Sequence, residues 1–278
     1  MEIVKDLTQL KQLIKDNKAR FDSVAKNNML MLSGLDSRIR NHEVSFDWSD
    51  SGLLIFLDEQ TYFNMYYYIS DGSNLPEVYC DKPVLIEEPE LNLSEKTGEK
   101  EKLLSKTGFH LYRRNIHVVK DLKNVEQISY SENHESTDEI QFIELSYNDP
   151  EMPGYLEKSS DLWRLYLGKT DLPKEHFSVS PDDHLICAIN GNGELAGTHW
   201  WKNHGRLSEG RHTVTAPEYY RRGIARELIR RWCVLASNAK ADRAATWISD
   251  KNTKSLNLYS KMGFVKSGKV IRQYIREV

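Results

Sequence analysis

The sequence predicts a mixed α/β (α+β) fold arranged as two tandem units. Three features of the 278-residue chain lead to this prediction. An alternating strand at Arg211–Thr215 runs into an arginine-rich turn and then an amphipathic helix. Two strand-like runs flank Asn190–Gly193 (Asn-Gly-Asn-Gly), which is a strong hairpin signal. A seven-residue segment occurs twice, which indicates duplication.

The repeated segment divides the chain into two halves. Leu103–Phe109 reads LLSKTGF and Leu258–Phe264 reads LYSKMGF, identical at five of seven positions and 155 residues apart. Each copy follows a helical stretch and precedes a basic, strand-prone segment, His110–Lys120 in the first half. The polar region Asp121–Glu135 separates the halves. We therefore expect one domain at residues 1–125 and a second at residues 126–278.

In the first half, the spacing of apolar residues predicts a helix around Val4–Ile14. The later elements are expected to be strands Leu53–Leu57 and Tyr62–Ile69, a turn Asp71–Asn74, a strand Pro83–Ile86 and a polar helix Glu95–Lys106. Tyr67–Ser70 lie 155 positions before the arginine-rich turn and contain no glycine, arginine or helix start. We expect this half to be a degenerate copy that is structural or shapes the substrate site.

In the second half, the capping-box spacing of Ser136 and Glu139 predicts a helix that begins at Ser136. The elements expected after it are a helical stretch Ser160–Leu167, strands Leu185–Ile189, Glu194–Trp201 and Arg211–Thr215, helix Ile224–Ala236, strand Ala245–Ser249, helix Thr253–Met262 and a final strand Val265–Ile275.

Composition is that of an ordinary globular protein, with 39% hydrophobic and 28% charged residues. No apolar run approaches the ~18 residues of a membrane span, and the first residues do not resemble a secretory leader, so we expect a cytoplasmic protein with no membrane partner. The net charge of −3 argues against a nucleic-acid binder. Cys80, Cys187 and Cys233 lie far apart and predict free thiols, and no histidine or cysteine spacing predicts a metal site.

The charge balance reverses between Arg211 and Arg243, where eight basic residues face three acidic ones. In its middle, the turn Tyr220–Arg226 is predicted to aim unpaired backbone N–H groups, the positive end of a helix and arginine side chains at one place, which suits a diphosphate. A solvated basic helix face is the alternative that charge alone favours.

Two other phosphate-like motifs are set aside. Gly191–Ala196 fits a dinucleotide fingerprint ending in alanine, but a strand and not the required helix is expected after it. Gly168-Lys-Thr170 resembles the end of a phosphate-binding loop, but Trp163 stands where that loop needs glycine. No serine lies in a GxSxG elbow.

Through Tyr220-Arg-Arg-Gly-Ile-Ala225 and the later element Asn252–Phe264, the sequence resembles the GNAT superfamily of acyl-CoA-dependent N-acyltransferases. The resemblance covers roughly Gln127–Val278 and is strongest over Leu185–Phe264. The family's turn reads Arg/Gln-x-x-Gly-x-Gly/Ala. Gly223 and Ala225 fit it, whereas Tyr220 departs at the first position, so Arg221 or Arg222 would replace one contact to the diphosphate.

The resemblance implies a mostly antiparallel sheet in which two adjacent parallel strands, here Arg211–Thr215 and Ala245–Ser249, splay apart and admit the pantetheine arm of acetyl-CoA. The contacts it implies for this acyl donor lie along one strand, in the turn and at one helix cap: Thr213, Val214, Thr215, Tyr220, Arg221, Arg222, Gly223, Ile224, Ala225, Arg226 and Asn252. No metal is implied.

In the implied reaction an amine attacks the thioester directly in a ternary complex. Tyr259 occupies the position of a general acid for the leaving thiolate, with a packing role as its alternative. The general base stays open among four side chains and water: His199, Glu194, His212 and Glu209. Trp200, Trp201 and Trp247 either line an acceptor pocket or belong to the core.

The acceptor, a small-molecule or protein amine, is not identified by the sequence. Two alternatives to an enzyme remain. One is a non-catalytic module that senses acetyl-CoA, and the other is a scaffold that binds no acyl-CoA.

Overall fold

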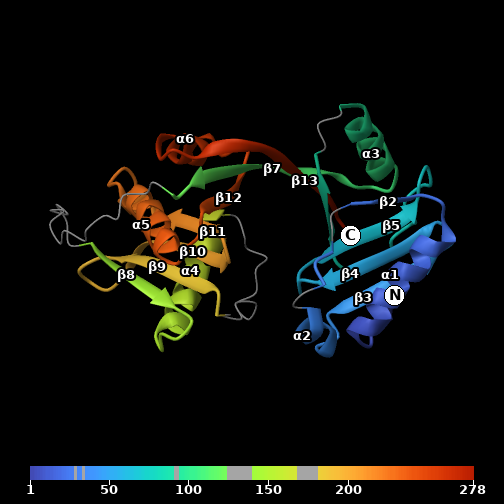
Figure 1. Cartoon of the computed structure of the whole chain (residues 1–278), viewed down its shortest axis with the longest axis horizontal. Coiled ribbons are helices and arrows are strands. Elements are labelled where there is room, and N and C mark those ends of the chain that lie inside the picture. The colour runs from blue at the N-terminus through green and yellow to red at the C-terminus, as the bar shows by residue number, and fades with distance from the viewer. Residues whose placement is uncertain (28–29, 33–34, 91–93, 124–139, 168–180) are drawn as a thin grey trace. The chain divides into compact units, whose positions relative to one another are not determined.

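The computed structural model describes residues 1–27, 30–32, 35–90, 94–123, 140–167 and 181–278. The chain forms two compact units, one of Met1–Asn115 with Lys269–Val278 and the other of Ile116–Gly268. Each unit is a mostly antiparallel sheet with helices on both faces (Figure 1). The predicted mixed α/β fold is therefore confirmed. No helix in the described ranges is both long and apolar enough to cross a membrane.

The first unit has the strand order β1-β3-β4-β5-β6-β13. Its elements are β1 (Glu2–Ile3), α1 (Leu7–Arg20), β2 (Val24–Lys26), α2 (Leu35–Arg40), β3 (Val44–Ser49), β4 (Gly52–Asp58), β5 (Phe63–Ser70), β6 (Val84–Pro89), α3 (Ser94–Lys106), the start of β7 (His110–Asp121) and the end of β13 (Val265–Arg276).

The apolar run of β4 explains why this sheet is covered on both faces. Successive side chains of a strand point to opposite faces, so an unbroken apolar run requires cover on each side. Leu53 and Ile55 pack into one core with Leu10 of α1. Leu54 packs into the other core with Leu104 of α3.

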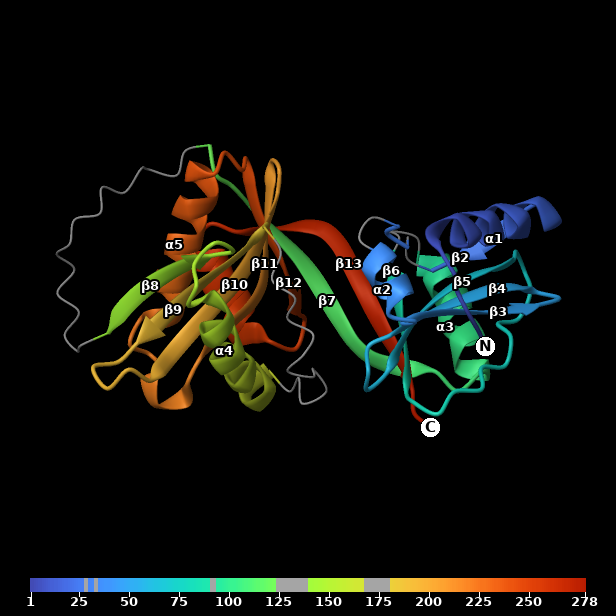
Figure 2. The same cartoon turned by 90° about the horizontal axis from the view of Figure 1, so that it is seen from below.

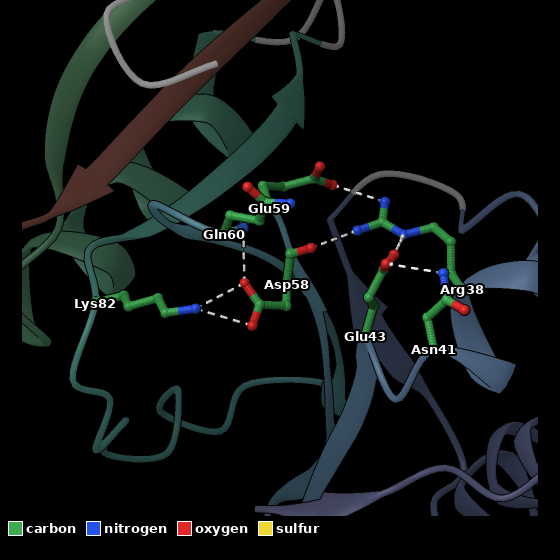
Figure 3. A network of polar contacts seen from close by, with 7 residues as sticks. All are labelled: Arg38, Asn41, Glu43, Asp58, Glu59, Gln60 and Lys82. Carbon is green, nitrogen blue, oxygen red and sulfur yellow. Dashed lines mark hydrogen bonds and ion pairs between the residues drawn. The ribbon is translucent and has the colours of Figure 1, made fainter. Parts of the chain in front are cut away.

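A polar network holds the β4–β5 turn against α2 (Figure 3). The Arg38 guanidinium donates to Glu43 at 3.1 Å, to Glu59 at 2.8 Å and to the Asp58 carbonyl at 2.7 Å. Lys82 Nζ lies 2.9 Å from both carboxylate oxygens of Asp58. Because these side chains are partly exposed, each ion pair contributes on the order of 1 kcal/mol or less, and together they set the geometry of the turn.

The second unit has the strand order β7-β12-β11-β10-β9-β8 (Figure 2). Its elements are the end of β7, β8 (Gln141–Ser146), α4 (Met152–Leu167), β9 (Asp183–Ile189), β10 (Leu195–His204), β11 (Leu207–Thr215), the 3-10 turn η2 (Pro217–Tyr219), α5 (Ile224–Asn238), β12 (Arg243–Ser249), α6 (Thr253–Lys261) and the start of β13.

The buried strand β9 divides its side chains between two cores in the same way as β4. Leu185 and Cys187 pack with Trp163 of α4. Ile186 packs on the opposite face with Trp232 of α5. The second unit is therefore also a sheet enclosed between helices.

Both copies of the repeated segment form the same helix end. Gly108 follows α3 and Gly263 follows α6, and each has a φ of +84°. The Phe264 N–H donates to the Tyr259 carbonyl at 3.0 Å, and the Phe109 N–H donates to the Leu104 carbonyl at 3.1 Å. This is the hydrogen bond of a Schellman C-cap, in which glycine relieves the left-handed position. The repeat in the sequence thus has a structural counterpart in each unit.

Two of the predicted helices differ from the structure. Gln141–Ser146 form strand β8, paired with β9, where a helix was predicted; Ser136 and Glu139 lie outside the described residues. Pairing with a buried neighbouring strand outweighed the local helix signal. Helix α4 begins at Met152, ahead of the predicted Ser160, because the first turn of a helix tolerates Pro153.

The unit boundaries also differ from the predicted division at 125/126, a point that lies outside the described residues. Residues 269–278 belong to the first unit because β13 pairs with β6 from Ile271 to Arg276. Elements β1, β2, α2 and β3 had no predicted counterpart, since they are short or weakly periodic.

We predict that Gly263→Ala and Gly108→Ala each lower the free energy of unfolding by about 1 kcal/mol, because an L-residue is strained in the left-handed region. A methyl group at Gly263 would approach only the end of the flexible Lys120 side chain, with Cε at 3.9 Å and Nζ at 4.0 Å, so the cost is conformational. Urea denaturation measures it.

Gly154→Ala is the matched control. Gly154 lies in α4, and an added methyl group would meet no atom within 4 Å. Alanine should leave stability unchanged or raise it by up to about 1 kcal/mol. Equal effects at the three glycines would contradict the assignment of the two C-caps.

Candidate functional site

The central feature of the second unit is a parallel strand pair that is paired over only part of its length. β11 and β12 pair from Leu207↔Arg243 to Gly210↔Thr246. Beyond this point β11 continues to Thr215 and β12 to Ser249. The predicted parallel neighbours are therefore present, and their pairing register ends midway. We call the region beyond Gly210 and Thr246 the split.

A β-bulge lies where the split begins. The β10–β11 register steps from Trp200↔His212 to Trp201↔Gly210, so that Arg211 is the extra residue. Gly210 and Thr213 consequently face the α5 side. His212 faces the α4 side, where its ring lies 4.9 Å from that of Trp163. The bulge thus decides which side chains lie beside the split.

The backbone of β11 presents hydrogen-bonding groups to the split. The Ala216 N–H donates to the Ala196 carbonyl on β10 at 2.9 Å. Since backbone groups alternate between the two edges of an antiparallel strand, those of Thr213 and Thr215 face the opposite edge, which β12 has left. Thr215 Oγ1 is also buried without a hydrogen-bond partner among the described residues. An extended ligand with amide groups would complete this edge.

The turn after β11 contains two left-handed residues. Arg221 has a φ of +64° and Gly223, the N-cap of α5, has a φ of +82°. Left-handed non-glycine residues are uncommon and cluster at functional sites. Glu227 makes the first intrahelical bond, to the Gly223 carbonyl at 3.0 Å, so the N–H groups of 224–226 have no intrahelical acceptor. A helix N-terminus of this kind can bind an anion.

The arginines around this turn fall into two groups. Arg230 and Arg231 both contact Glu227, and Arg231 also contacts Glu144 at 3.0 Å. Arg221 and Arg226 are exposed beside the N-terminus of α5. The local excess of positive charge is therefore concentrated at the helix end rather than spread along the helix face.

Other parts of the turn are also ordered by contacts. Arg222 lies over the Tyr219 ring, 5.3 Å from its centroid. Asn190 Nδ2 donates to the Tyr219 hydroxyl at 2.7 Å, so the predicted hairpin braces the turn. The backbone N–H of Asn190 donates to the backbone carbonyl of Glu194 at 2.9 Å, which confirms a hairpin in place of the dinucleotide motif. Tyr220 is 54% exposed.

Tyr259 of α6 comes together with Thr213 across the second unit. Its hydroxyl lies 3.0 Å from Thr213 Oγ1, and the side chain is 4% exposed. Burial raises the pKa of Tyr259, and the hydrogen bond with Thr213 lowers it by less. Tyr259 is therefore a neutral phenol. Asn252, in contrast, is the N-cap of α6, and its Oδ1 accepts the Ser255 N–H at 3.0 Å.

His199 is fully buried beneath this pair. Burial lowers the pKa of His199 to about 3. Its Nδ1 lies 2.7 Å from Thr213 Oγ1, and its ring lies 4.6 Å from that of Trp232. A buried, weakly basic imidazole cannot meet an incoming amine, so His199 is removed from the predicted general bases.

The other predicted bases and tryptophans lie in varied surroundings. Glu209 lies 3.4 Å from Arg211, and Glu194 accepts from Asn190 at 2.8 Å. Trp201 is buried in the core, as the packing interpretation expected. The remaining two tryptophans contact aromatic neighbours. The Trp200 ring stacks on that of Trp163 with centroids 5.5 Å apart, and the Trp247 ring lies tilted against that of His117 with centroids 4.5 Å apart.

The cysteines are free thiols, as predicted. Burial raises the pKa of Cys187 to about 12 and that of Cys233 to about 11, so neither is an activated thiolate. Within the described ranges, no group of three His, Cys, Asp or Glu side chains could hold a metal ion.

The first unit contains an equivalent strand pair with a filled split. β5 and β6 pair in parallel from Phe63↔Val84 to Met65↔Ile86. β4 occupies the other edge of β5 along its length. β2, which pairs with Tyr68–Ser70, therefore lies on the edge that β6 leaves. Between the part of β5 that pairs with β6 and the part that pairs with β2, the Asn27 side chain donates to the Met65 carbonyl at 2.9 Å and accepts from the Tyr67 N–H at 2.8 Å.

Side chains close the same region of the first unit. The Tyr67 hydroxyl donates to Glu88, and Glu88 pairs with Lys100 at 2.6 Å. Burial raises the pKa of Glu88, although Lys100 opposes this. In the repeated segment Leu104 stands where the second unit has Tyr259. Sequence analysis did not identify Asn27 or Glu88, since neither belongs to a recognisable motif.

Comparison with known proteins concerns both sequence and fold. Residues 138–264 match the profile of the Acetyltransferase (GNAT) family. No curated protein matches the chain significantly. A tandem GNAT protein from the clavulanic acid biosynthesis pathway has a TM-score of 0.56 at 14% identity, over 84% of this chain and 83% of that one.

Two bacterial structures give similar results. A GCN5-related N-acetyltransferase from Kribbella flavida has a TM-score of 0.52 at 12% identity, over 84% of this chain and 90% of that one. One from Sphaerobacter thermophilus has a TM-score of 0.51 at 10% identity, over 81% and 76%. At these identities the likeness establishes the fold alone.

The buried imidazole predicts a pH dependence of stability. Folding lowers the pKa of His199 from 6.5 to about 3. Between these two pKa values the unfolded chain therefore binds a proton at residue 199 that the folded chain does not bind. The free energy of unfolding that the neutral His199 contributes is fully present above about pH 6.5 and is lost as the pH falls toward 3, by up to ~1.4 kcal/mol per pH unit. Urea denaturation at about pH 6.5, 5.5 and 4.5 measures the slope.

His199→Asn is the matched variant, because it lacks the titrating group and keeps a side-chain N–H. The free energy of unfolding of this variant should change less steeply with pH than that of the wild type, by up to ~1.4 kcal/mol per pH unit. His184 and Glu227, whose pKa values are also lowered, contribute equally to both proteins. Identical slopes would show that His199 titrates normally.

Proposed function

We propose that the protein is an N-acetyltransferase that moves the acetyl group of acetyl-CoA to an amine, starting from the match of residues 138–264 to the Acetyltransferase (GNAT) family. The observation that carries the proposal is the incomplete β11–β12 pairing, which ends at Gly210↔Thr246 beside the anion-receiving end of α5. A pantetheine arm needs the first feature and a diphosphate needs the second.

The donor would be held at both ends of the split. Backbone groups of Thr213 and Thr215 would pair with the amides of the pantetheine arm, as an added strand would. The N–H groups of 224–226 would bind the diphosphate, with Arg221 and Arg226 supplying charge-assisted hydrogen bonds. Tyr220, which replaces the family's Arg or Gln, contributes no charge.

In the reaction, the amine nitrogen would attack the thioester carbonyl carbon. A C–N bond forms, the C–S bond breaks, and the amine proton passes to a base or to water. The leaving thiolate would take its proton from Tyr259, a neutral phenol near the C-terminal end of α6. The base stays open among Glu194, Glu209, His212 and water.

We further propose one donor site per chain. The split of the first unit is filled by β2 and Asn27 and bridged by Tyr67 and Glu88. Its repeated segment also has Leu104 in place of a phenol. This unit would then be structural or would shape the acceptor site.

A second candidate function is a sensor that binds acetyl-CoA without turnover. It is favoured by Tyr220 in the turn and by the burial of His199, which removes one candidate base. The sensor and the enzyme share the donor site and differ in whether thiol is released.

Calorimetric titration with acetyl-CoA should give one site per chain. The double variant Arg221→Ala/Arg226→Ala should weaken binding by about 10- to 100-fold, since it removes two charged donors. Arg243→Ala removes an exposed arginine at the far end of β12 and should leave the affinity unchanged. Two sites, or equal losses in both variants, would contradict this placement of the donor.

Thiol release from acetyl-CoA in the presence of a panel of amines separates an enzyme from a sensor. We expect amine-dependent release, and Tyr259→Phe should lower kcat by about 100-fold or more while the KM for acetyl-CoA stays unchanged. The exposed Tyr147 provides the control, Tyr147→Phe, with unaltered kcat. Binding without release would favour the sensor, and full activity of Tyr259→Phe would remove Tyr259 from the mechanism.

A further inference from the structure

A chain of polar side chains runs from the core to Tyr259. His199 on β10, Thr213 on β11 and Tyr259 on α6 are joined by contacts of 2.7 Å and 3.0 Å at Thr213 Oγ1. His199 is fully buried and Tyr259 nearly so. Buried polar groups are costly unless they are paired. The hydrogen-bond direction that leaves the fewest donors unpaired is therefore preferred in this series of three side chains.

The direction follows from His199. A neutral imidazole has one N–H donor and one acceptor nitrogen. Nε2 is buried without a hydrogen-bond partner in the described part of the chain, whereas Nδ1 faces Thr213. An orphaned buried N–H is rarer than an orphaned acceptor. The proton therefore belongs on Nδ1, which donates to Thr213 Oγ1.

The direction of the hydrogen bond between Thr213 and Tyr259 then follows. With its oxygen accepting from His199, Thr213 directs its own hydroxyl proton to its other neighbour, the Tyr259 oxygen. Tyr259 is the acceptor in this contact, so its own proton lies outside the chain. In the reverse direction, Tyr259 would donate to Thr213, and its proton would be engaged.

We propose that Thr213 and His199 are positioning residues, which hold the Tyr259 hydroxyl so that its proton is directed to the thioester sulfur. This rests on the proposed role of Tyr259 as general acid. During the step the O–H bond of Tyr259 breaks and an S–H bond forms. Negative charge then develops on the tyrosine oxygen, and the Thr213 hydroxyl already donates to it.

The β-bulge makes this arrangement possible. Because Arg211 is the extra residue, Thr213 falls on the α5 side with His199. Gly210 leaves room for the imidazole, since a methyl group there would lie 3.1 Å from His199 Cε1. The local backbone irregularity thus brings a hydroxyl behind the proposed acid.

A double-mutant cycle tests the coupling. Thr213→Val keeps the shape of the side chain and removes the hydroxyl, and it should lower kcat by about 10- to 100-fold with the KM for acetyl-CoA unchanged. Thr213→Ser keeps the hydroxyl and should retain most of kcat. In a Tyr259→Phe background, Thr213→Val should cause no further loss. Losses that multiply, or a loss in KM alone, would overturn the positioning role.

The tautomer of His199 is a second measurement, which does not depend on turnover. In wild-type protein with ¹⁵N-labelled histidine, NMR should show Nδ1 protonated and Nε2 bare, and a proton on Nε2 would overturn the proposal. Absence of thiol release by the wild type would refute the proposed function and the positioning role together. Turnover with multiplicative losses would refute the positioning role alone.

Discussion

The divergence of β11 from β12 is the constraint on which the rest of the second unit depends. Past Gly210 and Thr246 the pairing register ends, so the backbone groups of β11 need another partner. The bulge at Arg211 turns Thr213 toward α5 and Tyr259 at the same point. After Thr215 the chain enters the turn that leads into α5, where the N–H groups of 224–226 have no intrahelical acceptor. The interrupted strand pair thereby places the edge that β12 leaves, the Tyr259 hydroxyl and the N-terminal end of α5 along the course of β11.

The two units meet this constraint differently. In the first unit β5 also leaves β6, but β2 and Asn27 complete the edge with groups from the same chain. In the described part of the first unit, protein groups therefore occupy the edge of β5 that β6 leaves, and the Tyr67 hydroxyl donates to Glu88 of β6 in the same region. A duplicated fold that fills its own split in this way retains the sheet as a scaffold. This difference is the basis for proposing a single donor site, in the second unit.

Three polar side chains in the second unit also depend on partners from neighbouring elements. His199, Thr213 and Tyr259 are kept together because each satisfies a neighbour that water cannot reach. Nε2 of His199, for which the described residues offer no hydrogen-bond partner, is the cost of this arrangement and also indicates the direction of donation. Stability and the proposed chemistry therefore depend on the same buried hydroxyl.

The sequence by itself determined the local features of this protein. The Asn190–Gly193 hairpin, the turn before α5 and the two glycine C-caps are set by neighbouring residues, because left-handed positions and helix ends require particular side chains. Tertiary structure decided what depends on distant partners. Residues 141–146 became β8 through pairing with β9, the end of β13 joined the first unit through β6, and Asn27 and His199 acquired their roles from strands remote in the chain. Hydrogen bonds between segments far apart in sequence leave no periodic pattern, so only the folded chain reveals them.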